Sequence, residues 1–165
     1  MNRDDIISLE QITDFETYNP ILQFGEDLDF DNKFCVLKTH VGNIGFSYYD
    51  LGVAPSYILY GAILFLSFGS SYYVVNLEEK NVIYESRNSL SVIFEIVKCD
   101  KQSCVLFIGE MSLICFSLKG EKMWENHYRN TICDWSVMNE GVKMIFENNE
   151  KMLVLFSNGN GISAL

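Results

Sequence analysis

The sequence repeats a pattern of short apolar segments at a period of about forty residues. Its clearest unit, 114–125, joins an apolar run to a turn at 119–121. A similar segment begins at Tyr73. Another near the C-terminus aligns Leu155 with Phe116 at an interval of 39 residues. Short β-type runs and turns at this period are typical of arrays in which one small sheet stacks on the next.

Two further kinds of segment repeat at a similar interval. Phe65, Phe107 and Phe146 can be set in register at intervals of 42 and 39 residues. Segments 92–97 and 132–137 lie 40 residues apart. Apolar residues alternate within the runs, which is the period of a β-strand, and glycine or asparagine occupies most of the turns between them. Each repeating unit is therefore predicted to hold four antiparallel strands.

We predict an all-β fold: an incomplete propeller-like array of antiparallel four-stranded sheets in a single domain, 1–165. The repeats span 53–87, 91–128 and 131–165. In the leading segment 1–50, the pattern favours a short helix or coil over 3–13, where Ile6, Leu9 and Ile12 could share a helical face. It also favours two strands over 33–49. Three units cannot close a ring, which normally needs at least four. The strands at 33–49 are expected to add a partial fourth unit or to cap an exposed edge.

One turn carries a family resemblance. Trp124 follows 119–123, and this phrase resembles the Gly-Lys-x-x-Trp motif that closes a hairpin in pyrroloquinoline-quinone-type propeller repeats. The resemblance implies that Trp124 docks one sheet on the next and is buried between them. Tyr84 stands at this place in the preceding repeat, and the last repeat stops short of it. Cofactor use in that family needs a complete ring and its metal ligands, so we expect no cofactor and no metal.

Composition favours a folded chain away from membranes. Of the 165 residues 48% are hydrophobic. The longest apolar run, 57–68, is shorter than the stretch of about 20 residues that a membrane-spanning helix needs. The N-terminal residues lack a signal-peptide pattern, so a cytoplasmic location is expected. Few alanines and many asparagines point to a bacterial source. Five cysteines are present, four of them inside apolar strand runs, where free and buried thiols are expected.

Negative charge is concentrated at the start of the chain. The net charge is -10, and residues 1–50 carry ten acids against three bases, a net of -7. This balance argues against nucleic-acid binding, because neutralising phosphates requires basic side chains. Four carboxylates crowd into six positions, Glu26, Asp27, Asp29 and Asp31. They form either a solvated acidic loop or a docking surface for a basic protein partner.

That acidic stretch imitates the start of a calcium-binding loop without completing it. Asn32 stands where the loop needs its glycine, and Lys38 stands where it needs a bidentate glutamate. The chain has two histidines, His40 and His127, and no hydrolase, zinc-protease or phosphate-loop motif. A catalytic triad assembled only in space stays open as an alternative. We predict that the protein is not an enzyme.

Small, acidic, single-domain proteins of this build resemble the immunity proteins of bacterial toxin systems. The resemblance implies a protein that binds and neutralises a basic toxin domain, here through the four carboxylates of the acidic stretch. The alternative is a structural or scaffold β-protein that self-associates, or joins a larger complex, through an open sheet edge.

Overall fold

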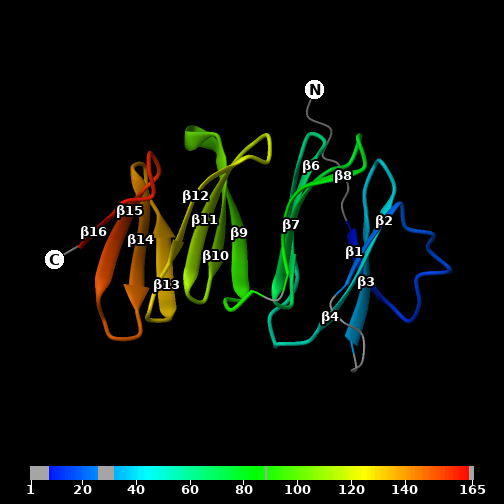
Figure 1. Ribbon diagram of the computed structural model, residues 1–165, viewed down its shortest axis with the longest axis horizontal. Coiled ribbons are helices and arrows are strands. Elements are labelled where there is room, and N and C mark those ends of the chain that lie inside the picture. The colour runs from blue at the N-terminus through cyan, green and yellow to red at the C-terminus, as the bar shows by residue number, and fades with distance from the viewer. Residues whose placement is uncertain (1–7, 26–31, 88, 164–165) are drawn as a thin grey trace.

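Four small sheets lie side by side in a row (Figure 1). The structure is a computed structural model, and it describes residues 8–25, 32–87 and 89–163. We call the sheets A to D in chain order. Each has four strands, and sheets A and D stand at opposite ends of the row. The predicted fold class, a propeller-like array of four-stranded sheets, is confirmed.

Sheets B, C and D are simple antiparallel meanders whose strands follow chain order. Each falls within one of the sequence repeats, because the repeated apolar runs become the strands and the glycine- and asparagine-rich segments become the turns. Sheet B comprises β5 (Ser56–Tyr60), β6 (Ile63–Phe68), β7 (Ser71–Asn76) and β8 (Asn81–Ser86). Sheet C comprises β9 (Ile93–Cys99), β10 (Cys104–Gly109), β11 (Ser112–Ser117) and β12 (Lys122–His127), with a 3-10 turn at Asp100–Gln102. Sheet D comprises β13 (Ile132–Val137), β14 (Gly141–Phe146), β15 (Lys151–Leu155) and β16 (Gly161–Ser163).

Sheet A is complete, although it falls outside the sequence repeat. Its strands are β1 (Ser8–Ile12), β2 (Leu22–Gly25), β3 (Asn32–Lys38) and β4 (Asn43–Tyr49), in the spatial order β1-β3-β4-β2. The predicted strands over 33–49 are β3 and β4. The edge strand β2 pairs with β4 in parallel, whereas all other pairs in the four sheets are antiparallel.

The short helix or coil predicted over 3–13 is wrong for its described part, because residues 8–12 form β1 and pair with β3. The prediction depended on Leu9 and Ile12 sharing one helical face. In a strand, residues three apart point to opposite faces. Leu9 packs toward sheet B, while Ile12 is buried on the other side of sheet A. Both apolar residues are thus accommodated, because sheet A is covered on both faces.

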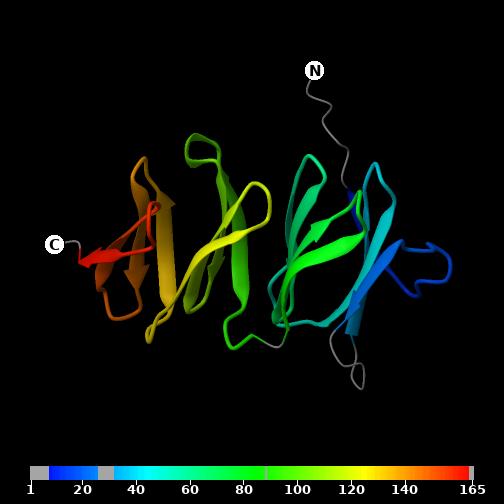
Figure 2. The same cartoon turned by 45° about the horizontal axis from the view of Figure 1, so that its top comes forward.

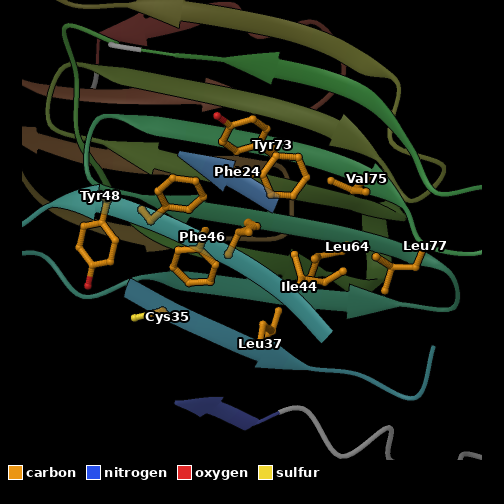
Figure 3. Packing of buried hydrophobic residues seen from close by; sticks show 12 residues of the cluster. Phe24, Cys35, Leu37, Ile44, Phe46, Tyr48, Leu64, Tyr73, Val75 and Leu77 are labelled. Carbon is orange, nitrogen blue, oxygen red and sulfur yellow. The ribbon is translucent and has the colours of Figure 1, made fainter. Parts of the chain in front are cut away.

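The core lies between the sheets in three clusters, one for each pair of neighbours. Figure 3 shows the cluster between sheets A and B. There Phe24 packs on Tyr73 with ring centroids 4.5 Å apart, and Phe46 stacks on Phe68 at 4.6 Å. Phe65, Phe107 and Phe116 meet in the cluster between sheets B and C. Burial of these inward faces is the main force that holds the sheets in a row.

The structure corrects two registers taken from the repeat. Phe65 and Phe107 were aligned as equivalents, yet they face each other across the gap between sheets B and C at 6.3 Å. Phe116 was aligned with Leu155, but Val154 and Phe156 face sheet C, so Leu155 points outward. Strands set one residue out of register exchange their faces. Phe107 and Phe146 point the same way in their sheets, because each is buried against the preceding sheet.

Candidate interaction face

A tryptophan joins sheet C to sheet D, as the resemblance to propeller repeats implied. Trp124 on β12 packs against the cluster between these sheets, and its indole Nε1–H donates a hydrogen bond of 2.9 Å to the carbonyl of Phe156. Its ring also lies on Gly159, where an added Cβ would approach within 2.8 Å of the ring. Trp124 is partly exposed at the outer edge of the sheet rather than fully buried.

The same joint recurs one sheet earlier, with tyrosine in place of tryptophan. Tyr84 on β8 meets Phe116 edge-on at 5.3 Å, and its hydroxyl accepts a hydrogen bond from Lys122 at 3.2 Å. Gly120, in the β11–β12 turn, fits against sheet B, since an added Cβ would lie 2.8 Å from Val74. Gly120 and Gly159 both have positive φ, +89° and +72°, so each turn favours glycine for its backbone as well as its contact.

The first strands of sheets C and D form a second joint. Trp135 on β13 donates from its Nε1–H to the Glu95 carboxylate at 3.0 Å, and its ring stacks on Phe94 at 6.1 Å. Between the nearby turns lies a groove of about 530 Å³. Lys101 and Gln102 both donate to Asn139 across the groove, so they tie its two sides together. We therefore assign this groove to the contact between the two sheets.

The outward face of sheet A is covered by its own chain. Residues 13–21, which connect β1 to β2, lie over this face, and we call them the cap. Phe15 in the cap packs on Phe34 with ring centroids 5.4 Å apart. Gly45 leaves the room for it, because a Cβ there would lie 3.0 Å from the Phe15 ring. Beneath the cap, Val36 is 0% exposed although it points away from sheet B.

Polar contacts fix the cap in place. The Asn43 side chain donates to the carbonyl of Tyr18 at 2.8 Å, and the Ile21 N–H donates to the carbonyl of Asn43. At the edge of the cap, Lys38 pairs with Glu10 at 2.6 Å and lies 5.7 Å from the centre of the Tyr18 ring. Outer positions of the cap, among them Asp14 and Glu16, are exposed. Sheet A therefore presents a polar surface to solvent.

No other segment of the described residues lies over the outward face of sheet D (Figure 2). Four aliphatic side chains alternate with the inward-facing ones and therefore lie on this face. We call it the open face, and its aliphatic members are Ile145, Leu153, Leu155 and Ile162. Ile162 is 52% exposed, and the other three are partly exposed. Lys143, Lys151 and Asp134 share the open face with them.

The open face corresponds to a face that sheet C buries. In sheet C, Leu106, Cys115 and Trp124 form one cross-strand row against sheet D. The matching row of sheet D is Lys143, Leu153 and Ile162. Aliphatic residues therefore stand in sheet D where a following sheet would cover them, with a lysine in place of one leucine. Exposed apolar faces of this kind mark interaction sites.

Sequence reasoning missed this face, although the sequence carries a signal for it. Residues 152–156 form a continuous apolar run where a half-exposed strand would alternate with polar residues. Such runs are typical of strands covered on both faces. The predicted site residues Glu26, Asp27, Asp29 and Asp31 lie outside the described residues.

The cysteines contribute packing to the core. All five are free; four are buried and Cys133 is exposed, although it also stands in an apolar run. Burial raises the pKa of the Cys35 thiol. Cys99 and Cys104 lie opposite each other on β9 and β10, and hydrogen bonding to Cys115, together with burial, raises the pKa of Cys104 to about 12. Buried thiols with raised pKa values stay protonated and react slowly.

Within 8–25, 32–87 and 89–163, no group of three or more acidic, histidine or cysteine side chains is arranged to hold a metal ion. His127 lies at the exposed end of β12, 3.1 Å from Glu125. In the same part of the chain, no helix has the length and apolar character needed to cross a membrane.

Comparison with known proteins finds likeness in fold. No family model and no curated protein matches the sequence. The β-propeller domain of Cps50 (Swd1) from Myceliophteria thermophila is 12% identical with a TM-score of 0.50, over 82% of this chain and 52% of that one. The N-terminal domain of Nup159 is 8% identical with a TM-score of 0.45, over 68% and 33%. Hsv2 from Kluyveromyces lactis is 14% identical with a TM-score of 0.40, over 66% and 35%.

The chain thus spans between about a third and a half of the length of these solved chains. None of the comparisons supports the resemblance to toxin-immunity proteins. The likeness to the Cps50 domain agrees with the stacking of the four sheets. In fold, the chain is an array of four propeller-type sheets, capped at one end and open at the other.

Proposed function

We propose that this chain is a non-enzymatic binding module that joins a larger protein assembly through the open face of sheet D. The observation that carries the proposal is the contrast between the two ends of the row. Val36 on the outward face of sheet A is fully buried, whereas Ile162 on the outward face of sheet D is half exposed. An exposed aliphatic face in an array of stacked sheets marks a place where a further surface can pack.

The chemistry of the open face suits a protein partner. It combines aliphatic side chains with a few charged ones: Asp134 and Lys151 lie on either side of Ile145, and Lys143 lies beside Leu153. A surface that mixes apolar and charged side chains is usual at protein interfaces. A partner that lays a sheet or another apolar surface on this face would bury Leu153 and Ile162, as sheet D buries Trp124 and Cys115 of sheet C.

A second candidate site is proposed from charge alone. Glu26, Asp27, Asp29 and Asp31 have no cation among them in the sequence. Such a cluster would attract a basic partner and speed its encounter with the chain, with an effect that weakens as salt is added. A basic partner of this kind is what the resemblance to immunity proteins implied, and the acidic segment supports that reading only through its charge.

Site-specific photo-crosslinking in the source cells tests the main proposal. A photoreactive residue replaces Leu153 on the open face, and in a matched variant it replaces Glu16 on the cap, which is also exposed. We expect a defined protein adduct from position 153 and none from position 16. The absence of an adduct at 153, or the same set of adducts at both positions, would overturn the proposal.

A further inference from the structure

We infer that the partner of the open face is the open face of a second copy of this chain, so that two four-sheet arrays pair through their D sheets. The inference rests on the proposed function, since it names the occupant of the same face. Three features carry it: the covering of sheet A, the continuity of the row of sheets, and the order of charges across sheet D.

Sheet A cannot receive the open face by simple stacking. The cap already lies on its outward side, with Phe15 and Pro20 against Gly45. Within the described residues, sheet D therefore has the one apolar sheet face left uncovered. When two copies of such a chain meet through the same face, the contact has two-fold symmetry and closes as a pair. Both ends of the resulting array would then carry the polar cap.

The open face also continues an interface that the molecule builds three times. Sheets A to B, B to C and C to D pack through aliphatic and aromatic rows. The row Lys143, Leu153 and Ile162 is the next in this series, matched to the buried row that ends at Trp124. A further four-stranded sheet with an apolar face is the surface that such a row fits, and sheet D itself is one.

In one cross-strand row of the open face, the charges are ordered so that a reversed copy of the row places opposite charges against each other. Asp134 on β13, Ile145 on β14 and Lys151 on β15 are direct cross-strand neighbours, so an acid and a base flank an aliphatic residue. A two-fold axis parallel to the strands reverses this order in the second copy. Asp134 of one copy then lies over Lys151 of the other, twice, while the two Ile145 side chains meet between them. Lys143, the other outward side chain of β14, then lies beside its own copy, where its long stem lets the ammonium group reach solvent. Opposed charges of this kind set register and orientation at an interface.

Sedimentation velocity and equilibrium of the purified full-length chain over a range of concentrations tests the inference. We expect a reversible monomer–dimer equilibrium. Leu153→Asp should raise the dissociation constant by at least about tenfold, because it places a carboxylate at the apolar centre of the contact. Leu90→Asp is the matched control: Leu90 is 93% exposed in the connection between sheets B and C, away from the open face. It should leave the dissociation constant unchanged.

Exchanging the charges at positions 134 and 151 distinguishes this specific pairing from nonspecific association. Asp134→Lys alone and Lys151→Asp alone should each weaken the dimer, because each puts like charges opposite one another. The double variant should regain most of the affinity, since it restores opposite signs with the positions exchanged. Far-UV circular dichroism and urea unfolding establish that each variant folds. Failure of the double variant to recover, with both singles folded and weakened, would contradict the proposed register.

The outcome also separates this inference from the proposed function. A chain that stays monomeric at every concentration, or a dimer indifferent to Leu153→Asp, overturns the inference. If a photoreactive residue at 153 still captures a different protein in the source cells, the proposed function stands and the second copy is excluded as its partner. If position 153 captures nothing, both proposals fail.

Discussion

The first and last sheets end the same row of strands in opposite ways. Sheet A departs from the repeat: its edge strand is parallel, and its outward face carries the cap. Sheet D follows the repeat, and the outward face it presents is the one that would receive a next unit. The part of the chain outside the repeat therefore covers the outward face of sheet A. The part that follows the repeat leaves the outward face of sheet D uncovered.

The two ends also differ in charge. Exposed cap residues include the acids Asp14 and Glu16, whereas the open face carries two lysines, Lys143 and Lys151, and one acid, Asp134, among aliphatic side chains. Lysines on an exposed sheet discourage indiscriminate aggregation at little cost to a chosen contact, because their long stems lie along apolar surface while the ammonium reaches solvent.

The largest expected effect on stability comes from placing a carboxylate under the cap, compared with placing one on the open face. Val36→Asp buries an unpaired carboxylate and should lower the free energy of unfolding by about 3–5 kcal/mol. Leu153→Asp, on a face open to water, should lower it by about 1 kcal/mol. Urea unfolding at a protein concentration where the chain is monomeric provides the measurement. Equal losses at the two positions would show that the ends do not differ as described.

Trp124, which joins sheets C and D, can be compared with Ile162, which occupies the matching position on the open face. Trp124→Ala removes a ring packed on Gly159 and should cost about 3 kcal/mol, whereas Ile162→Ala, in the matching row of sheet D, should cost less than about 1 kcal/mol. Trp124→Phe keeps a ring but loses the hydrogen bond to Phe156, for about 1 kcal/mol. Thermal or urea unfolding of the three variants measures this order, and a Trp124→Ala loss under about 1 kcal/mol would deny the docking role.

Loosening the cap should convert part of the closed end into an open one. Phe15→Ala removes the ring that covers Gly45 and should cost about 2 kcal/mol, less than a fully buried phenylalanine because Phe15 is partly exposed. Amide hydrogen exchange should rise in β1 and β3 and stay unchanged in β14 and β15. Unchanged exchange in sheet A would mean that the cap contributes little to the closed end.

The smallest expected effect on stability concerns the acidic stretch. Replacing Glu26 by glutamine, and Asp27, Asp29 and Asp31 by asparagine, should change the free energy of unfolding by less than about 0.5 kcal/mol. Dimerisation through sheet D should be unaffected, while association with a basic partner should slow at low salt and little at high salt. Stopped-flow association at two salt concentrations measures this, and an unchanged on-rate would leave the segment as a solvated loop.

The repeated part of the chain could be predicted from its sequence because each strand there is local and alternates. Tyr73, Val75 and Leu77 share one face as their spacing implied, and the turn at Gly120 lies where its glycine predicts. Register was harder to predict. Turns of unequal length shift the strands by one residue, which is why Leu155 faces outward while Phe116 faces sheet B.

The two ends could not be predicted in the same way, because their character depends on contacts between distant residues. Leu9 and Ile12 satisfy a helical spacing as well as a strand covered on both faces, and only the cap decides between them. The apolar run 152–156 indicates that both faces of this strand are apolar. The same run would occur whether or not another segment covers the outward face.

Thiol labelling compares the two ends most directly. Val36→Cys and Leu153→Cys are made separately in a Cys133→Ser background, which removes the exposed native thiol and leaves the four buried ones. At a concentration where the chain is monomeric, we expect position 153, which is partly exposed, to react readily with the label. Position 36 should react at least about a hundredfold more slowly, because the cap must open first. Equal rates at the two positions would contradict a row of sheets that is closed at A and open at D.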